Sequence, residues 1–550
     1  MIIELFLASF VLLFTLGWGA WMKRILGMQT SSLVITSLLG LSLFSIICCL
    51  ISFFMPIRWG MEIGFIAVAL LAFILPKMRV FLAAFPVQIK SVWFWVFAVI
   101  VLLVGSYFAF VPDQFGYYVP TLIWLKNFGL VIGTSNVDWS ISQMSLFHIM
   151  ESGLDETLDY FLRINIFIVL LYLLYVFEKK AYLLLLFVPF YFLFIQSLSP
   201  DIPVALISLI IVNEICFHPQ KETGNTSLII SMFLFAVKPT VFWLLLWILF
   251  IEFFQNRKTL FCKENLSAFI VSGIFLLLVL AKNIISSSTL IYPATFPLLN
   301  TWWQNSPFVI DYIAEVGQSK PFNLQYSLQE LASMSFFQKF HTWLTFDNLR
   351  AYINMFVLLV SVGFGLFACL KKHKLYITLW LAILIKMVFT FFFSGQFRFF
   401  LDGLWPLLLI LLLQLKIHPL KIKILALTLF LTVGIALSVP QKWINLWPKT
   451  YVEWMIEGFS ARSILVPETD YLNQYKTATI GNFSFNVSTA YIFNVDTPQP
   501  AFTIDALRQF FHWGIFPQMK DPNNIRKGFY IKTLSEEEKD KLKSIIKDVK

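Results

Sequence analysis

Apolar runs of about 20 residues, each closed by a short polar connector, recur through the first 440 residues of the chain. About 20 helical residues cross a hydrocarbon core about 30 Å thick, and a helix satisfies its own backbone hydrogen bonds there. The pattern therefore predicts an all-α polytopic membrane bundle of about fourteen spans. The expected spans are 2–21, 31–54, 60–76, 91–110, 161–178, 181–198, 202–217, 227–237, 240–255, 266–282, 350–370, 375–393, 400–415 and 424–440.

Two of these runs depart from the common pattern. The run at 227–237 is too short to cross alone, but Lys238 and Pro239 interrupt an otherwise continuous apolar stretch, and the alternation of charged connectors requires a crossing. The first run begins almost at Met1, without a basic leader or a convincing small-residue cleavage site. We therefore expect a retained helix there rather than a cleaved signal peptide.

Every second connector is rich in lysine and arginine. The positive-inside rule places such connectors in the cytoplasm, which puts both termini outside. Three long polar segments then face outward: 111–160, 283–349 and everything after about 441. The basic connectors hold Lys23 and Arg24, Lys77, Arg79 and Lys90, Lys179 and Lys180, Lys221, Arg257, Lys258 and Lys263, the KKHK sequence from Lys371, and Lys416, Lys421 and Lys423.

The composition agrees with a membrane protein. Hydrophobic residues make up 59% of the 550 residues and charged residues 13%, with a mean hydropathy of +0.78, which excludes a water-soluble globule. The net charge of +10 lies in the connectors rather than along one face, so it indicates topology and not nucleic-acid binding. The five cysteines show no CxxC or Cys/His spacing, so neither a disulfide framework nor a zinc site is expected.

The outer segments have their own patterns. In 111–160, Tyr118, Leu122, Leu125 and Leu130 recur at helical spacing, which predicts an amphipathic helix lying in the membrane interface. The second segment carries aromatic residues suited to headgroup depth, namely Trp302, Trp303 and Trp343.

The C-terminal segment, 441–550, changes character. The sequence TATIGNFSFNVSTAYIF alternates like a strand, and Ser535 and Glu538 form a capping-box pattern before a charged helix. We expect a small α+β domain outside the membrane.

Polar residues collect at the expected outer ends of the spans. They are Asp113 in VPDQF, Asp201 in SLSPDIP, Lys238 in AVKPT, Lys282 and Asn283 in AKNIISSS, and Arg398 in SGQFRFF. If these ends converge, they form a cavity with an acidic patch beside a cationic one. A carboxylate there could take a proton from a hydroxyl acceptor, while the cations neutralise the charge that builds on a departing lipid phosphate.

Several of these residues also have structural interpretations. Asp113 could end a helix as a Pro-Asp turn, Asp201 could be an ordinary helix N-cap, and Lys282 could snorkel from a helix end. His148 fits a packed or interfacial histidine better than a catalyst, so it stays outside the expected site. Lys386 lies in the middle of an expected span, where an unpaired ammonium costs about 2.5 to 3.5 kcal/mol, so it should face protein or a water-filled cavity. A proton or ion pathway remains open for it.

The motifs of soluble enzymes are missing. The sequence contains no Gly-rich phosphate loop, no nucleophile elbow and no HExxH. A cytosolic nucleotide-sugar or ATP site is therefore not expected.

Asp113, followed by YYVPTLIWLKNFGLVIG, resembles the first outer loop of bacterial GT-C-type glycosyltransferases. In that loop an acidic residue precedes a Tyr-His-(Leu)-(Pro)-like stretch, a Trp and a Gly, and Tyr118 stands where the pattern has His. SPDIP, KPT, AKNIISSSTLIYP and QFRF also resemble one branch of polytopic proteins near this class, which likewise ends in a small outer domain. The resemblance covers most of the chain in order, through short motifs.

The resemblance implies an inverting sugar transfer with Asp113 as general base and the lipid phosphate under Arg398, Lys238 and Lys282. Tyr118 departs from the pattern at the position of the histidine, which puts metal binding in doubt because enzymes of this class that use a divalent ion bind it with additional acidic or His side chains in these loops. We therefore expect no cofactor, and a divalent metal stays an alternative that the sequence does not indicate. Acceptor-side or loop-supporting roles are expected for Tyr117, Tyr118, Trp124, Asn136, Asp201, Asn283 and Tyr292.

The expected partners are a polyprenyl-phosphate sugar donor, a glycan, lipid or protein acceptor, and the lipid bilayer. The expected location is the bacterial inner membrane, with the site and the C-terminal domain facing the periplasm or exterior. Two other functions remain open. One is a transporter or flippase of lipid-linked saccharides, although the paired half-repeats of such proteins are not found. The other is a non-catalytic partner in glycan assembly or polymerisation.

Overall fold

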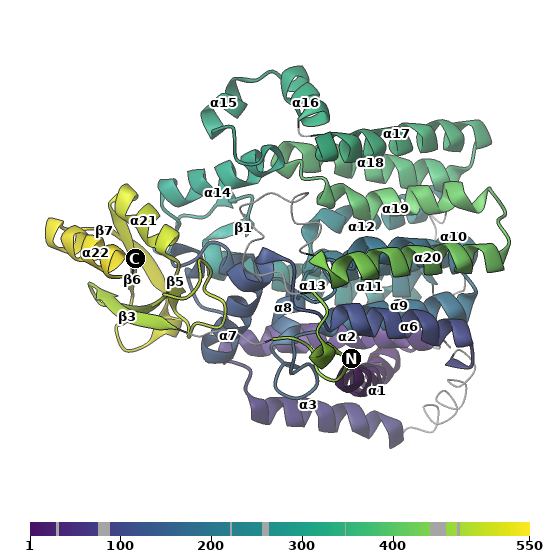
Figure 1. Ribbon diagram of the computed structural model, residues 1–550, viewed down its shortest axis with the longest axis horizontal. Coiled ribbons are helices and arrows are strands. Elements are labelled where there is room, and N and C mark those ends of the chain that lie inside the picture. The colour runs from purple at the N-terminus through teal and green to yellow at the C-terminus, as the bar shows by residue number, and fades with distance from the viewer. Residues whose placement is uncertain are drawn as a thin grey trace.

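The computed structural model describes residues 1–28, 32–74, 89–219, 223–255, 263–346, 348–440, 458–469 and 474–549. Over these residues the chain forms a helical bundle with a small strand-containing region at one end (Figure 1). The helices of the bundle are α1 (Ile2–Leu26), α2 (Leu33–Phe54), α3 (Trp59–Leu71), α6 (Val92–Gly105), α9 (Ile164–Lys179), α10 (Asp201–Phe217), α11 (Thr223–Val237), α12 (Phe242–Gln255), α13 (Lys263–Ser287), α17 (Asn348–Lys371), α18 (Lys374–Ser394), α19 (Arg398–Leu413) and α20 (Pro419–Ser438).

The prediction of a helical membrane protein is confirmed. Within the described residues, six helices are long and apolar enough to cross a membrane, and further apolar helices of 10 to 17 residues accompany them. The count of fourteen spans stays a prediction. The six candidate spans are Ile2–Leu26, Leu33–Phe54, Asn265–Ser287, Leu349–Lys371, Lys374–Ser394 and Pro419–Ser438.

One expected span has a different local structure. The run at 181–198 is a 3-10 helix, Tyr182–Tyr191, followed by turns rather than an α-helix. Pro189 lies inside it and has no amide hydrogen to donate. Its apolar residues are largely buried, so this run packs inside the bundle.

The outer segments contain shorter elements. The first holds a single π-helical turn (Gln114–Tyr118), α7 (Val119–Phe128) and α8 (Leu146–Glu151). The second holds the β1–β2 hairpin (Thr289–Ile291 and Phe296–Leu298), α14 (Pro307–Ser319), the 3-10 turn Lys320–Phe322, α15 (Leu328–Ser333) and α16 (Phe336–Thr345).

The expected interfacial helix in the first segment is corrected by the structure. Tyr118, Leu122, Leu125 and Leu130 are at most 4% exposed, so α7 and its flanks are packed inside the protein. An apolar stripe at helical spacing fits a protein interior as well as a lipid surface, and here other segments of the chain cover it.

The C-terminal region has two small sheets with one helix packed near each. Antiparallel β3 (Tyr475–Ile480) and β4 (Phe483–Ser488) turn at Gly481, whose φ of +59° suits glycine, and β5 (Ala501–Phe502) pairs parallel to β4. The remaining elements are α21 (Ile504–Trp513), β6 (Ile515–Met519), β7 (Phe529–Thr533) and α22 (Glu536–Asp548), with β6 antiparallel to β7.

Two expectations for this region are confirmed. The alternating stretch forms the β3–β4 hairpin, and Ser535 and Glu538 make the capping box of α22. The proposed boundary near residue 440 lies at the edge of 441–457, which is outside the described residues.

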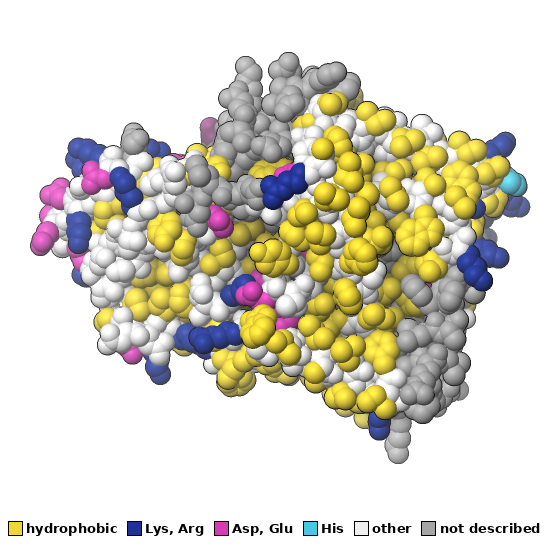
Figure 2. Space-filling view, turned by 60° about the horizontal axis from the view of Figure 1, so that its bottom comes forward, with side chains coloured by type: hydrophobic (Ala, Val, Ile, Leu, Met, Phe, Trp, Pro, Cys, Tyr) yellow, Lys and Arg dark blue, Asp and Glu magenta, His cyan; other side chains and the backbone are white. Residues whose placement is uncertain are grey.

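The surface separates into zones along the long axis. Figure 2 shows hydrophobic side chains covering much of the bundle, with Lys and Arg gathered at its far end. The connectors after α17 and α19 lie at that end, and the C-terminal region lies at the opposite end (Figure 1). An apolar belt between two charged ends is the arrangement expected of a membrane-spanning bundle.

Candidate functional site

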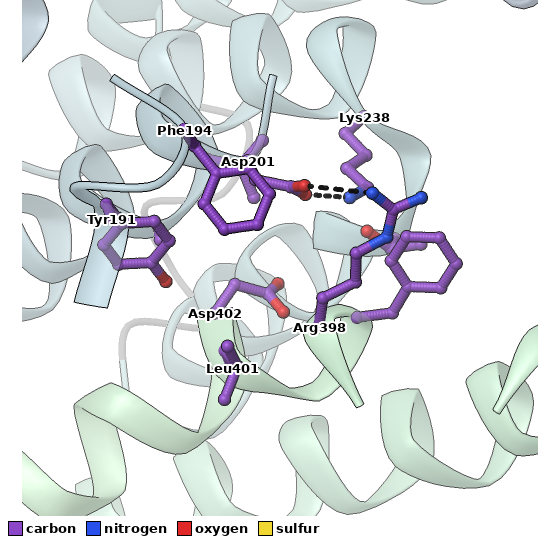
Figure 3. A pocket seen from close by; sticks show the side chains of 11 residues that line it. Tyr191, Phe194, Asp201, Lys238, Arg398, Leu401 and Asp402 are labelled. Carbon is purple, nitrogen blue, oxygen red and sulfur yellow. Dashed lines mark hydrogen bonds and ion pairs between the residues drawn. The ribbon is translucent and has the colours of Figure 1, made fainter. Parts of the chain in front are cut away.

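Four of the five charged residues that the sequence places at the outer ends of the spans lie together in the structure, at helix ends. Asp113 precedes the π-helical turn, Asp201 begins α10, Lys238 separates α11 from the 3-10 turn Pro239–Val241, and Arg398 begins α19. The ammonium of Lys238 donates to Oδ1 of Asp201, and Nη1 of Arg398 lies 3.1 Å from Oδ2 of Asp113. Figure 3 shows Lys238 and Arg398 converging on Asp201.

Local sequence explains two of these positions. Lys238 adopts an extended backbone because it precedes Pro239, which disfavours the helical region for the residue before it. Asp201 follows Pro200 at the start of α10, but its carboxylate does not cap that helix. The N-cap interpretation of Asp201 is therefore wrong, since its carboxylate contacts Lys238 and Arg398 instead.

Asp113 is held as a carboxylate. Burial alone would raise its pKa, but the positive charges of Arg398 and Lys320 outweigh burial, so the pKa lies below the usual range. The negative charge of Asp201 acts in the opposite direction and is the smaller effect. Asp113 therefore has the ionised form that a general base needs.

Arg398 uses only part of its guanidinium on these acids. Nη1 reaches Asp113 at 3.1 Å and Asp201 at 3.9 Å. Nε is buried without a hydrogen-bond partner, and no hydrogen bond from Nη2 occurs among the described residues. Nε–H and Nη2–H form one edge of the guanidinium, and such an edge can bind two oxygens of one phosphate. In Arg398 this edge has no hydrogen-bond partner among the described residues.

The structure supplies a partner for Lys386. Its side chain is fully buried, and its ammonium donates to a carboxylate oxygen of Asp402 and to the carbonyl oxygen of Phe399. Trp243 donates from Nε1 to the other oxygen of Asp402 at 2.9 Å. Asp402 lies one helical turn after Arg398, so Lys386 holds the turn of α19 that presents Arg398.

A small, partly open hollow lies among these groups. Its wall contains Asp201, Lys238, Arg398 and Asp402, and apolar residues such as Tyr191 and Phe194 complete it. The ring of Phe399 lies 4.3 Å from the Lys238 ammonium and 5.2 Å from the Arg398 guanidinium carbon. Aromatic faces at these distances attract cations, so both side chains are held at the hollow.

The fifth position, Lys282, lies elsewhere. It is 5% exposed, and its ammonium donates to the carbonyl oxygen of Met144 at 2.8 Å. The snorkelling interpretation is wrong because the side chain is buried against protein. Among the described residues, Lys282 also makes no contact with Asp113, Asp201 or Arg398, so it is not part of this charged cluster. Asn283 binds the carbonyl oxygen of Leu290 at 2.8 Å, which holds the start of the β1–β2 hairpin.

The aromatic residues near Asp113 take supporting positions. The ring of Tyr117 lies 4.4 Å from that of Tyr118, and Tyr118 stacks on His148 at 5.0 Å. Nδ1 of His148 also accepts a hydrogen bond from the backbone amide of Ser145, as part of the capping box of α8. Burial lowers the pKa of His148 to about 3. The packed interpretation of His148 is confirmed.

Three other expected site residues lie away from the hollow. Asn136 donates to the carbonyl oxygens of Trp303 (3.0 Å) and Phe529 (3.3 Å), and Tyr292 donates to that of Trp139 (2.7 Å). The buried ring of Trp124 lies 6.1 Å from that of Phe529. These contacts brace the outer segments against each other and the C-terminal region.

Sequence reasoning missed one charged residue of the site. Asp402 could have been found, because it follows Arg398 by four residues and so shares its helix face.

The described residues contain no group of three His, Cys, Asp or Glu side chains placed to hold a metal ion. The acid and base groups that are present suit proton transfer and anion binding. Metal independence stays a prediction.

One family model, described as "Domain of unknown function (DUF8201)", matches residues 1–405. This range includes every charged residue of the site and ends before the C-terminal region. No curated protein and no solved structure matches the chain.

Proposed function

This chain belongs to the family described as a domain of unknown function, DUF8201, and from the charged site inside the matched range we propose that it is a membrane glycosyltransferase. It moves a sugar from a polyprenyl-phosphate-linked donor to a cell-envelope acceptor at the outer face of a bacterial inner membrane. Its fold is a GT-C-like bundle of about fourteen spans. The C-terminal domain lies on the same outer side.

One observation carries the proposal. Asp113 and Arg398 are 285 residues apart in the chain, yet they meet beside Asp201 and Lys238 at the rim of an apolar bundle. Ionisable groups at membrane depth are costly and mark functional sites. A carboxylate beside two cations supplies both a proton acceptor and an anion site.

The chemistry is an inverting displacement. The bond between the sugar C1 and the phosphate oxygen breaks, and the phosphate leaves with the bonding electrons. The acceptor oxygen forms the new bond to C1, and Asp113 takes the proton of the acceptor hydroxyl. Lys238 and the free edge of Arg398 stabilise the charge that develops on the phosphate.

The test is sugar transfer by Asp113→Asn and Arg398→Gln variants in membranes. A panel of radiolabelled polyprenyl-phosphate hexoses and N-acetylhexosamines serves as donor. We expect Asp113→Asn to slow transfer by about 100- to 10,000-fold through loss of the base, and Arg398→Gln by about 100-fold or more through loss of phosphate stabilisation.

The C-terminal region offers a matched control. Asp505 and Arg508 form an exposed ion pair of 2.8 Å, so Asp505→Asn and Arg508→Gln change the same groups away from the site. Both controls should transfer sugar at the wild-type rate. Full activity of Asp113→Asn, or no transfer by the wild type from any donor, would falsify the proposal. Unchanged glycan with altered lipid movement would indicate a transporter instead.

A further inference from the structure

The helix α16, in the second outer segment, has an apolar side and a polar side. Its large hydrophobic residues recur at the spacing of an α-helix, so they share one side of it. A capping box of Ser335 and Gln338 fixes where the helix begins. The apolar side holds Phe336, Phe337, Phe340, Trp343 and Leu344, and the polar side holds Gln338, His341, Thr342 and Thr345.

Two hydrogen bonds fasten α16 to one end of the bundle. Nε1 of Trp343 donates to the carbonyl oxygen of Gly395 at 2.6 Å, and the side-chain amide of Asn354 donates to the carbonyl oxygen of Trp343 at 2.8 Å. Gly395 directly follows α18 and Asn354 lies near the start of α17, and both helices are candidate membrane spans. In Figure 1, α15 and α16 project sideways from the bundle at this end. The helix α16 therefore lies at the level where two apolar spans meet the polar outer segments.

Protein covers only part of the apolar side of α16. The rings of Phe340 and Trp343 lie 5.8 Å and 5.6 Å from that of Phe391 on α18. Phe336 is 49% exposed and Phe337 is 79% exposed. Two phenylalanine rings at the start of the helix are therefore left largely open to the surroundings.

These exposed rings continue the apolar surface of α18. The ring of Phe336 lies 5.9 Å from that of Phe392, which is more than half exposed, as are Phe389 and Phe393. A helix long and apolar enough to cross a membrane exposes such a surface to lipid. The lipid that covers this side of α18 is therefore continuous with the space around Phe336 and Phe337.

Lys339 adds a positive charge at the edge of the apolar side. It lies on the wall of a second small hollow, together with Gln318 from α14 and Phe392 from α18. Its ammonium makes no ion pair or hydrogen bond within the part of the chain that the structure describes. Helices that lie in a membrane interface combine an apolar side with lysines that reach the lipid headgroups. The chemistry around α16 therefore suits a lipid surface.

We propose that α16 is an interfacial anchor, which lies in the adjacent membrane leaflet with Phe336 and Phe337 among the acyl chains and Lys339 on a lipid phosphate. The second outer segment thus supplies the interfacial helix that the sequence predicted for the first, where α7 is buried. This anchor is independent of the proposed sugar transfer, because it rests on the surface of α16 and α18 alone.

The experiment attaches the environment-sensitive fluorophore nitrobenzoxadiazole to Phe337→Cys in the full-length protein, after the five native cysteines are replaced. The labelled protein is placed in nanodiscs of phosphatidylethanolamine and phosphatidylglycerol, with or without lipids that carry a nitroxide quencher near the top of an acyl chain. Gln338→Cys is the matched control, because Gln338 is the next residue but lies on the polar side of α16.

We expect the label on Phe337→Cys to emit at a shorter wavelength than the label on Gln338→Cys and to lose most of its intensity to the nitroxide lipid. The reason is that an interfacial helix buries its apolar side about 5–10 Å into the leaflet. Equal emission and equal quenching at the two positions would overturn the proposal. Short-wavelength emission without quenching would also overturn it, because a protein surface, such as that of a second copy, would then cover α16.

The charge of Lys339 is tested in the labelled Phe337→Cys protein. Lys339→Glu should reduce quenching in nanodiscs that contain phosphatidylglycerol, because a carboxylate is repelled by anionic headgroups, and Lys339→Arg should retain it. The difference between the two variants should shrink in nanodiscs of phosphatidylcholine, which carries no net charge. Equal quenching of the two variants in the anionic nanodiscs would overturn the lipid contact of Lys339.

Discussion

Lys386 shows how a single residue can be misread when its partner lies on the next helix, 16 residues further along the chain. An ammonium in the middle of an apolar run suggests an ion pathway. The fully buried side chain instead contacts Asp402 and the carbonyl oxygen of Phe399, on the helix that carries Arg398. At the residue scale, the site is therefore built from paired charges with one guanidinium edge left free.

The pair gives a prediction about stability. Lys386→Met leaves the carboxylate of Asp402 buried with only Trp243 as a donor, which should lower the free energy of unfolding by about 3 to 5 kcal/mol. The double variant Lys386→Met and Asp402→Leu removes both charges and should recover much of that loss. The measurement is the thermal midpoint in detergent, with Lys372→Met in an exposed connector as control. Equal midpoints for all variants would contradict a buried ion pair.

At the scale of elements, the first outer segment is held between the bundle and the C-terminal region. The amide of Phe529 donates to the carbonyl oxygen of Ile132 at 3.0 Å, and Arg526 donates to that of Phe53 at 3.0 Å. The segment that begins with Asp113 is thus packed on both sides. This packing explains why its apolar stripe is buried instead of lying in lipid.

Asn136 tests the packing of the first outer segment against the C-terminal region. Its side-chain amide donates to the carbonyl oxygen of Trp303 in the second outer segment and to that of Phe529 in the C-terminal region. Asn136→Ala leaves buried carbonyl oxygens unpaired, which costs about 1 to 3 kcal/mol. We expect a lower thermal midpoint and faster proteolytic release of the C-terminal region. Asn523→Ala is the control, since Asn523 is exposed on a loop of the same region. Identical proteolysis of the two variants would show that Asn136 does not hold the docking.

At the scale of the whole molecule, the two ends carry different kinds of charge. The end that holds the α17–α18 and α19–α20 connectors shows mainly Lys and Arg, whereas the C-terminal region at the other end shows both basic and acidic side chains (Figures 1 and 2). The positive-inside rule predicts that the basic end lies in the cytoplasm. In the proposed orientation, the charged site and the C-terminal region would face outward.

Orientation can be measured by thiol labelling of intact cells. Asn523→Cys and Lys372→Cys are introduced one at a time after the five native cysteines are replaced. A membrane-impermeant maleimide should label the first variant in intact cells, and the second only after the membrane is permeabilised. The reverse pattern would place the site on the cytoplasmic side, where no polyprenyl-phosphate sugar facing the exterior could reach it.

The membrane class and several site positions could be predicted from the sequence. Hydropathy is a sum over neighbouring residues, so long apolar helices are visible without a structure. Asp113, Asp201, Lys238 and Arg398 were found because each interrupts or borders an apolar run. The hairpin and the capping box of the C-terminal region were predicted for the same reason, since both depend on residues a few positions apart.

Only the tertiary structure decided which polar residues meet. Lys282 resembles Lys238 in its sequence context, yet its ammonium donates to the carbonyl oxygen of Met144, whereas that of Lys238 donates to the carboxylate of Asp201. The burial of α7 and the pairing of Lys386 with Asp402 were also decided there. These outcomes depend on how helices and outer segments pack across long sequence separations, and hydropathy and charge alternation carry only local information about that packing.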